Sequence, residues 1–167
     1  KGCPSKIVTV EEIAQNYNGQ TQQMKIKACI NDMCERYGVQ YVLLGGDVDI
    51  IPTQMCYVDS YIDQGLGNGS TYAAYIPADV YYACPGDLNW DTNNDDRAGD
   101  PKHDIIDYIP IIYVTRAPVR NVTDANVFVN RIIEYEQSPK YIKSFLQAGA
   151  ILDPIYVKGE DYADLLF

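Results

Sequence analysis

The sequence is short of histidine, of basic residues and of long apolar runs. It has a single His in 167 residues, so chemistry that needs an imidazole within this chain depends on His103. No apolar run approaches the ~18–20 residues of a membrane span, so we predict none. The 13 Lys and Arg face 23 Asp and Glu, a net charge of −10. This balance argues against nucleic acid and anionic membranes as partners, and it is typical of a secreted or cell-surface protein or of one that binds cations or basic substrates.

Cysteine pairs with the spacing of a metal or redox site are also lacking. The five cysteines, Cys3, Cys29, Cys34, Cys56 and Cys84, contain no C-x-x-C pair, so neither a zinc knuckle nor a thioredoxin-like site is predicted. Their number is odd, so at least one is unpaired within the chain. Buried free thiols are the ordinary state of such residues.

Short apolar runs that suit buried strands alternate with segments of helical spacing. The pattern predicts strands over residues 7–10, 41–44, 79–84, 110–115 and 145–152. It predicts helices over residues 11–17, 21–37, 123–137 and 160–167, with Gly38 and Thr123 as caps. Residues 52–78 are expected to be irregular. Their run QGLGNGS lacks the Lys-Ser/Thr of a phosphate-binding loop, so it indicates a flexible surface loop.

This order of elements predicts a single α/β domain over residues 1–167, a doubly wound, Rossmann-like parallel sheet flanked by helices in three layers. Asp47, Arg116 and Asp153 each follow or end a predicted strand. They should therefore lie at the carboxyl edge of the sheet, where open α/β sheets bind ligands. For Asp47 the alternative is a solvated turn after a core strand.

The residues alone do not select a reaction. A dyad of His103 with Cys84 or Cys56 would need a nucleophile next to a base, but His103 lies in loop-like sequence and no nucleophile elbow is present. A hydrolase with paired carboxylates stays open, because Asp is abundant and nothing singles out one pair.

Five segments carry a resemblance to a known family. They are KIVTVEEI, YVLLGGDVDIIPTQ, ADVYYAC, GDLNWDTNNDDRAGD and PIIYVTRAPVRNVTDANVFVNRIIEYE. In this order, over residues 6–152, they resemble the gingipain family of cysteine peptidases. Two blocks are the most specific. One surrounds GGDVDIIP, and the other runs from the strand predicted at 110–115 through RAPVR to the helix that ends in YE, called the YE helix below. The resemblance implies a caspase-like fold, with the active site at the carboxyl ends of the strands.

The same resemblance implies that the chain is an incomplete catalytic domain. In the family the catalytic His follows the strand after the YE helix, and the catalytic Cys comes one strand later. We therefore expect both beyond Phe167, and the family's first strand and helix before Lys1. The expected partners are the remainder of the catalytic domain and a protein or peptide substrate, and the chain alone is expected to be inactive. The alternative is a non-catalytic, calcium-stabilised module for binding or attachment.

Asp79 is the position that the resemblance marks for substrate binding. It falls where Arg-specific members of the family place an acidic residue of the pocket for the P1 side chain. A carboxylate there selects Arg or Lys through charge-assisted hydrogen bonds. The alternative is a structural acid in a strand.

An acidic run between Asp79 and Asp107 predicts a Ca²⁺ site. The segment holds eight Asp, opposed only by Arg97 and Lys102, and such crowding favours a bound cation. The predicted ligands occupy positions 1, 3, 5, 7 and 12 of an EF-hand-like loop, and they are Asn89, Asp91, Asn93, Asp95 and Asp100. Asn94 stands where such a loop needs Gly. The alternative is a solvated acidic loop.

Overall fold

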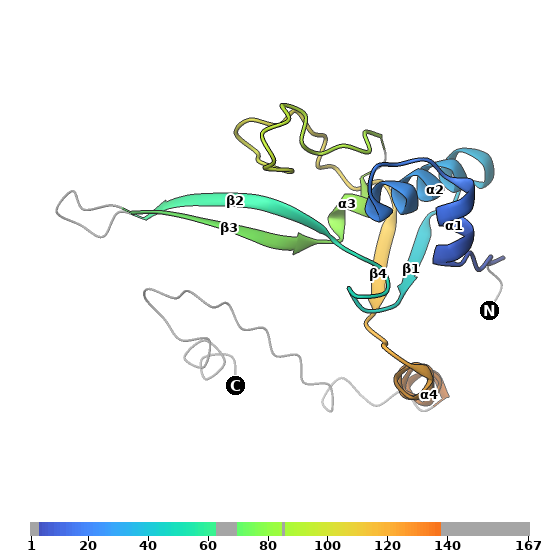
Figure 1. The fold of residues 1–167 in the computed structure, drawn as a ribbon. Helices are drawn as coiled ribbons and strands as arrows, with labels where there is room; N and C mark the ends of the chain where they lie inside the picture. Colours follow the sequence, from blue (N-terminus) through green and yellow to red (C-terminus); the bar gives the residue numbers. More distant parts are fainter. Residues whose placement is uncertain (1–3, 63–69, 85, 138–167) are drawn as a thin grey trace. The chain divides into compact units, whose positions relative to one another are not determined.

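The computed structural model describes residues 4–62, 70–84 and 86–137. It divides into two units, residues 1–125 and 126–167, and each is considered by itself. The elements in chain order are α1 (Val10–Asn16), α2 (Gln22–Tyr37), β1 (Tyr41–Gly45), β2 (Gln54–Ile62), β3 (Ser70–Ala78), α3 (Val80–Ala83), β4 (Tyr113–Ala117) and α4 (Val122–Gln137) (Figure 1). The fold of the described residues is mixed α/β. None of their helices has the length and apolarity to cross a membrane.

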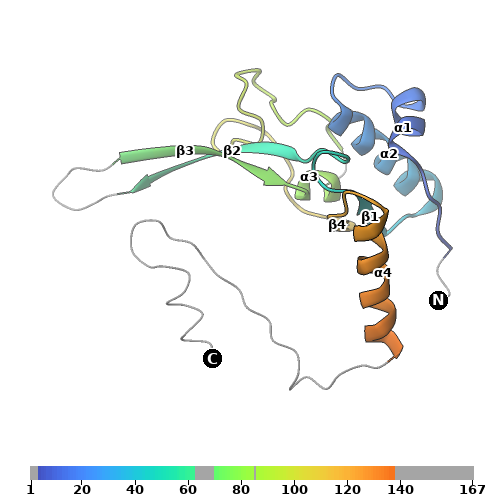
Figure 2. The ribbon, with the colours of Figure 1, turned by 60° about the horizontal axis from the view of Figure 1, so that its bottom comes forward.

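A two-stranded parallel sheet forms the centre of the first unit. β1 pairs with β4 in register from Tyr41 opposite Tyr113 to Gly45 opposite Ala117, and Figures 1 and 2 show the two strands side by side. The predicted strand at 41–44 is confirmed. The strand predicted at 110–115 lies slightly later in the chain, because pairing with β1 begins only at Tyr113.

The core lies against this sheet. Leu44 of β1 is buried with residues of α2 and α3 and with Trp90. The further buried members of this cluster include Ile26, Cys29, Ile30, Tyr81 and Tyr82. The rings of Tyr81 and Tyr82, and those of Tyr81 and Trp90, meet edge to face with centroids 5.1 Å apart. This geometry is favourable for aromatic pairs.

The strand predicted over residues 7–10 is wrong. Residues 4–9 have no regular secondary structure, and α1 begins at Val10. The Thr9 hydroxyl accepts the Glu12 N–H, and the Glu12 carboxylate accepts the Thr9 N–H. This capping box starts a helix where the β-branched residues had suggested a strand. The helices predicted over 11–17 and 21–37 are confirmed, and Gly38 ends α2 in the left-handed conformation with φ 63°.

The excursion after β1 is a hairpin and not the irregular segment predicted for residues 52–78. β2 and β3 pair antiparallel over nine residues each, from Gln54 opposite Ala78 to Ile62 opposite Ser70 (Figure 1). The prediction for residues 63–69, which hold most of the glycine-rich run, lies outside the described part of the chain. The extended segment predicted at 79–84 is also wrong, because residues 80–83 form the single helical turn α3.

The helix predicted from Thr123 to Gln137 is confirmed as α4, which begins one residue earlier. The Asn121 side chain, and not that of Thr123, accepts the N–H of Asp124 at 3.0 Å, as an N-cap residue does. The strand predicted at 145–152 and the helix predicted at 160–167 lie outside the described residues.

Candidate functional site

The carboxyl edge of the parallel sheet brings Arg116 and Asp79 together. The guanidinium binds the carboxylate through two hydrogen bonds, from Nε to Oδ2 at 2.6 Å and from Nη2 to Oδ1 at 2.7 Å. Its Nη1 also donates to the carbonyl oxygens of Gly46 and Ile51, at 2.8 and 2.7 Å. One cation at the end of β4 therefore ties the turn after β1 to the residue that precedes α3.

The pairing sets the charge state of Asp79. Its side chain is 30% exposed and that of Arg116 is 13% exposed. Burial alone would raise the pKa of Asp79, but the hydrogen bonds and charge of Arg116 outweigh it and hold the pKa below 3.8. Asp79 is therefore an anion at neutral pH. Each of its oxygens already accepts one hydrogen bond, so a basic substrate side chain would share this carboxylate with Arg116.

Asp47 lies at the same edge and is built into the turn after β1. Its Oδ1 accepts the N–H of Val48 at 2.9 Å, and its Oδ2 accepts Nε of Arg120 at 2.6 Å. The Arg120 hydrogen bond lowers the pKa of Asp47 below 3.8. Its own N–H donates to the carbonyl of Val119. The sequence thus predicted the location of Asp47 and Arg116 correctly, while Asp153 lies outside the described residues.

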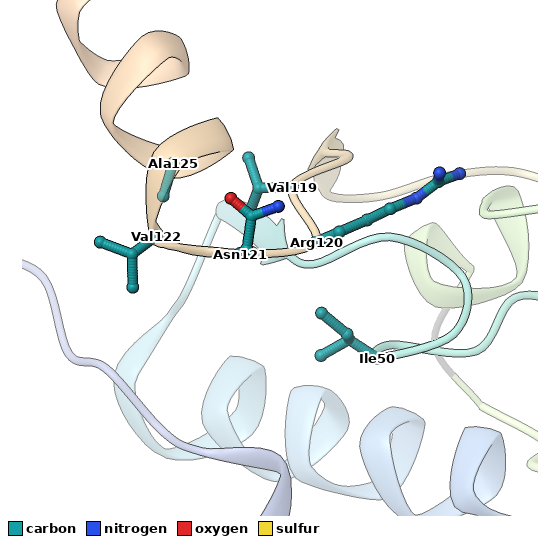
Figure 3. Close-up of a pocket in the computed structure, with 7 residues that line it drawn as sticks. Ile50, Val119, Arg120, Asn121, Val122 and Ala125 are labelled. Atoms are coloured by element: carbon teal, nitrogen blue, oxygen red, sulfur yellow. The ribbon is translucent and has the colours of Figure 1, made fainter.

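A shallow pocket of about 290 Å³ opens beside Arg120. Figure 3 shows Ile50 on one side of it and Asn121, Val122 and Ala125 on the other. Val119 and Gly45 complete the lining. Apart from Arg120 and Asn121 these residues are apolar, and none of them is a nucleophile. The pocket can hold an apolar group but supplies no catalytic one.

The described thiols are not arranged for nucleophilic catalysis. Cys29, Cys56 and Cys84 are buried, Cys34 is partly buried, and none of the four is in a disulfide. Burial raises the pKa of each, that of Cys56 to about 11. Since the thiolate is the nucleophile, a raised pKa disfavours nucleophilic attack by these cysteines.

The histidine faces a carboxylate and not a thiol. His103 Nδ1 lies 2.8 Å from Oδ2 of Asp100, and this contact raises the pKa of His103 and lowers that of Asp100. No hydrogen bond joins His103 to a cysteine in the described part of the chain. The described residues therefore do not bring His103 into a dyad with Cys84 or Cys56.

In the acidic segment, Asn and Asp side chains accept hydrogen bonds from backbone N–H groups of the same segment. The Asp91 carboxylate accepts the N–H groups of Asp95 and Asp96, both at 2.9 Å. The Asn89 and Asn93 side chains accept the N–H groups of Asp91 and Asp95 at 3.1 and 3.2 Å. These short-range bonds satisfy backbone donors of a loop that has no regular structure.

Three of the five predicted calcium ligands, Asn89, Asp91 and Asn93, turn side-chain oxygens onto backbone N–H groups of the loop itself. Among the residues that the structure describes, no group of three His, Cys, Asp or Glu side chains could hold a metal ion. Asp100 is 1% exposed and accepts the N–H of Lys102 besides facing His103. Asn94 does adopt the left-handed conformation, with φ 59°. Calcium binding at these residues stays a prediction.

Comparison with known proteins identifies the family of this chain. The model of peptidase family C25 matches residues 2–154, nearly the whole sequence. The chain belongs to peptidase family C25. No curated protein and no solved structure matches it. The family match identifies a cysteine peptidase domain, a hydrolase of peptide bonds, and it confirms the resemblance to the gingipains.

Sequence reasoning missed one buried cation of this C25 domain. Lys27 is 0% exposed, and its Nζ lies 4.3 Å from the ring centroid of Tyr81 and 4.8 Å from that of Trp90. Burial lowers its pKa to about 8. The signal was present, because Lys27 lies three residues before Ile30 and seven before Cys34, on the inner side of α2.

Proposed function

We propose that these 167 residues are part of a gingipain-like cysteine endopeptidase domain whose Cys–His dyad is supplied by residues outside this chain. The C25 match over residues 2–154 carries the proposal. The described thiols support it, because each is buried or partly buried and has a raised pKa, which disfavours a role as the nucleophile. The expected partners are a protein or peptide substrate and the remainder of the catalytic domain.

The proposal includes a caspase-like arrangement, with the reaction at the carboxyl edge of the sheet. Arg116 fixes this edge through Asp79, Gly46 and Ile51. Such a fixed edge is the kind of rigid support that a catalytic constellation needs. Asp79 is proposed to contact a basic P1 side chain there, in company with Arg116. A secreted or cell-surface location accords with the net charge of −10.

The experiment uses the longer protein that this proposal implies. It is assayed on a fluorogenic peptide with Arg at P1, then inactivated with iodoacetamide, and the modified cysteine is located by mass spectrometry. We expect activity to be lost with one modification at a cysteine outside the chain, and the four described thiols to stay unmodified. Inactivation through Cys29, Cys34, Cys56 or Cys84, reproduced by its Ser variant, would contradict the proposal.

A further inference from the structure

One edge of the β2–β3 hairpin presents backbone groups that have no hydrogen-bond partner among the residues that the structure describes. Tyr57 lies opposite Tyr75 in the antiparallel register. The N–H of Tyr57 donates to the carbonyl of Ala98 at 2.9 Å, outside the hairpin. Tyr57 and Tyr75 are therefore a pair without mutual hydrogen bonds, and their backbone groups point away from the ladder. Because inward and outward groups alternate along a strand, the N–H and C=O of Ala73 also point outward from β3.

Pro77 supports this assignment independently. It lies two residues after Tyr75, opposite Met55, so its nitrogen also faces outward. Proline has no N–H, and sheets accept it where the missing donor would face the open side of an edge strand. The ladder between β2 and β3 therefore loses nothing at Pro77, and β3 is an edge strand.

The two edges of the hairpin differ in what covers them. The outer side of β2 is bonded to Ala98, and the guanidinium of Arg97 lies 5.0 Å from the ring centroid of Tyr57. In the described part of the chain no backbone group pairs with Ala73 or Tyr75 on the outer side of β3. Both residues are exposed.

The usual protection of this edge is limited to Pro77. Natural edge strands are commonly blocked by charged side chains, by proline or by bulges. β2 and β3 together carry one charged residue, Asp59, and its carboxylate is paired with Lys102. An extended, uncharged strand with free donors and acceptors is a template for one more strand.

We propose that the outer edge of β3, at Ala73 and Tyr75, binds an extended, net-cationic segment of a protein substrate as a third strand. The inference rests on the proposed function, because a peptidase takes a polypeptide, and an open strand edge recognises an extended polypeptide. The net charge of −10 attracts a basic segment and disfavours a second copy of the chain. β3 ends one residue before Asp79, so an added strand runs beside the proposed P1 contact.

The test measures peptide binding to the purified 167-residue chain by fluorescence anisotropy. The probe is a capped decapeptide of alternating Arg and Val. Its controls are the same peptide with alternate backbone nitrogens methylated and a version with Glu in place of Arg. Ala73→Pro removes the outward N–H and leaves the inward ladder intact, while Ala73→Val keeps the N–H. We expect the peptide to bind Ala73→Pro about tenfold more weakly than the wild type, because one neutral hydrogen bond is lost and the peptide carbonyl that accepted it is left without a donor. Binding to Ala73→Val should be unchanged.

The methylated and the acidic peptides should both bind more weakly than the probe. Equal binding by the Pro and Val variants, or by the methylated peptide, would overturn the proposal. So would self-association of the peptide-free chain that Ala73→Pro abolishes, since the edge would then belong to a second copy. If Ala73→Pro does not fold, hydrogen exchange of the wild type decides: saturating peptide must protect the amides of Ala73 and Tyr75.

These readouts are independent of turnover. Loss of edge binding in a longer protein that still hydrolyses peptides removes only this inference. Edge binding by the 167-residue chain, together with no hydrolysis by the longer protein, removes only the proposed function.

Discussion

Arg116 joins three segments of the chain through one guanidinium, at a residue whose side chain is only 13% exposed. Replacing it with alanine would leave the Asp79 carboxylate unpaired and the carbonyls of Gly46 and Ile51 without their donor. Partly buried groups that lose their partners cost about 1–3 kcal/mol each. We expect Arg116→Ala to lower the free energy of unfolding by about 2–4 kcal/mol, measured by urea denaturation at pH 7.

Arg120 offers a matched control at the same edge. It also pairs with an Asp through Nε, but its side chain is 71% exposed. Exposed ion pairs contribute about 0–1 kcal/mol, so Arg120→Ala should cost less than about 1 kcal/mol. Similar losses for the two variants would show that Arg116 is not the structural centre of the edge.

The buried Lys27 should make the free energy of unfolding depend on pH. Its pKa is lowered from 10.5 to about 8, first by burial and against the attraction of Cys84 and Asp87. The unfolded chain therefore binds more protons than the folded one between pH 8 and 10.5, so the Lys27 contribution to stability rises with pH there. Below pH 8 the buried charge carries its full cost, about 3 kcal/mol.

The comparison with Lys27→Met isolates this effect. Methionine keeps the apolar stem and removes the titration. Urea denaturation at pH 7 to 10 should show the free energy of unfolding of the wild type rising relative to that of Lys27→Met across this range. A constant difference between the two proteins would mean that Lys27 does not titrate in it.

At the scale of the elements, the sequence predicts several helices and strands from local patterns, but it does not predict which strands pair over long distances in the chain. Helical spacing and the Gly38 cap predicted α2, and the apolar run at 41–44 predicted β1. The β-branched residues at 7–10 suggested a strand although Thr9 and Glu12 already had the spacing of a capping box. The sequence does not predict the hairpin, because the glycine-rich run QGLGNGS makes residues 52–78 look irregular.

The candidate site likewise has features that the sequence predicts and features that it does not. The position of Asp47 and Arg116 at the carboxyl edge followed from the strands that precede them. The pairing of Arg116 with Asp79 joins residues 37 positions apart, and no local pattern encodes which of many Asp side chains it selects. The open edge of β3 depends likewise on register, which only the paired strands define.

The acidic segment carries a prediction at this scale. If residues 89–100 bind calcium, the ion stabilises the folded state by mass action and raises the melting temperature. Calcium is titrated to millimolar concentrations while thermal unfolding is followed for the wild type and for Asp91→Ala. Asp87→Ala is the matched control, since it removes a nearby carboxylate outside the predicted ligand set. A wild type without a shift, or an Asp91→Ala variant with the full shift, would show that the loop is only solvated.

At the scale of the whole molecule, the 167-residue chain is expected to hydrolyse no peptide. Burial raises the pKa of each of its described thiols, and its one imidazole faces Asp100. Incubation with fluorogenic Arg and Lys peptides under reducing conditions should give no turnover above that of buffer. Thiol-dependent turnover that Cys84→Ala or His103→Ala abolishes would contradict this.

In the proposed complete enzyme, we expect Asp79 to contribute to substrate selection. If its carboxylate contacts a basic P1 side chain, Asp79→Asn removes a charge-assisted interaction that only Arg and Lys substrates use. We expect kcat/KM on an Arg substrate to fall by about 10²-fold, through a higher KM and a lower kcat, and to change little on a substrate with an uncharged P1 residue.

The ion pair between Arg116 and Asp79 offers a second explanation for a loss of activity in Asp79→Asn, and it also provides the control. Asp79→Asn also weakens the bond that fixes the carboxyl edge, and a purely structural loss would lower activity on every substrate alike. Arg116→Lys disturbs the same pair from its other side while leaving the Asp79 carboxylate in place, so its losses should not depend on the P1 charge. A selective loss confined to Asp79→Asn supports the substrate contact, whereas equal losses on both substrates for both variants would make Asp79 a structural anion.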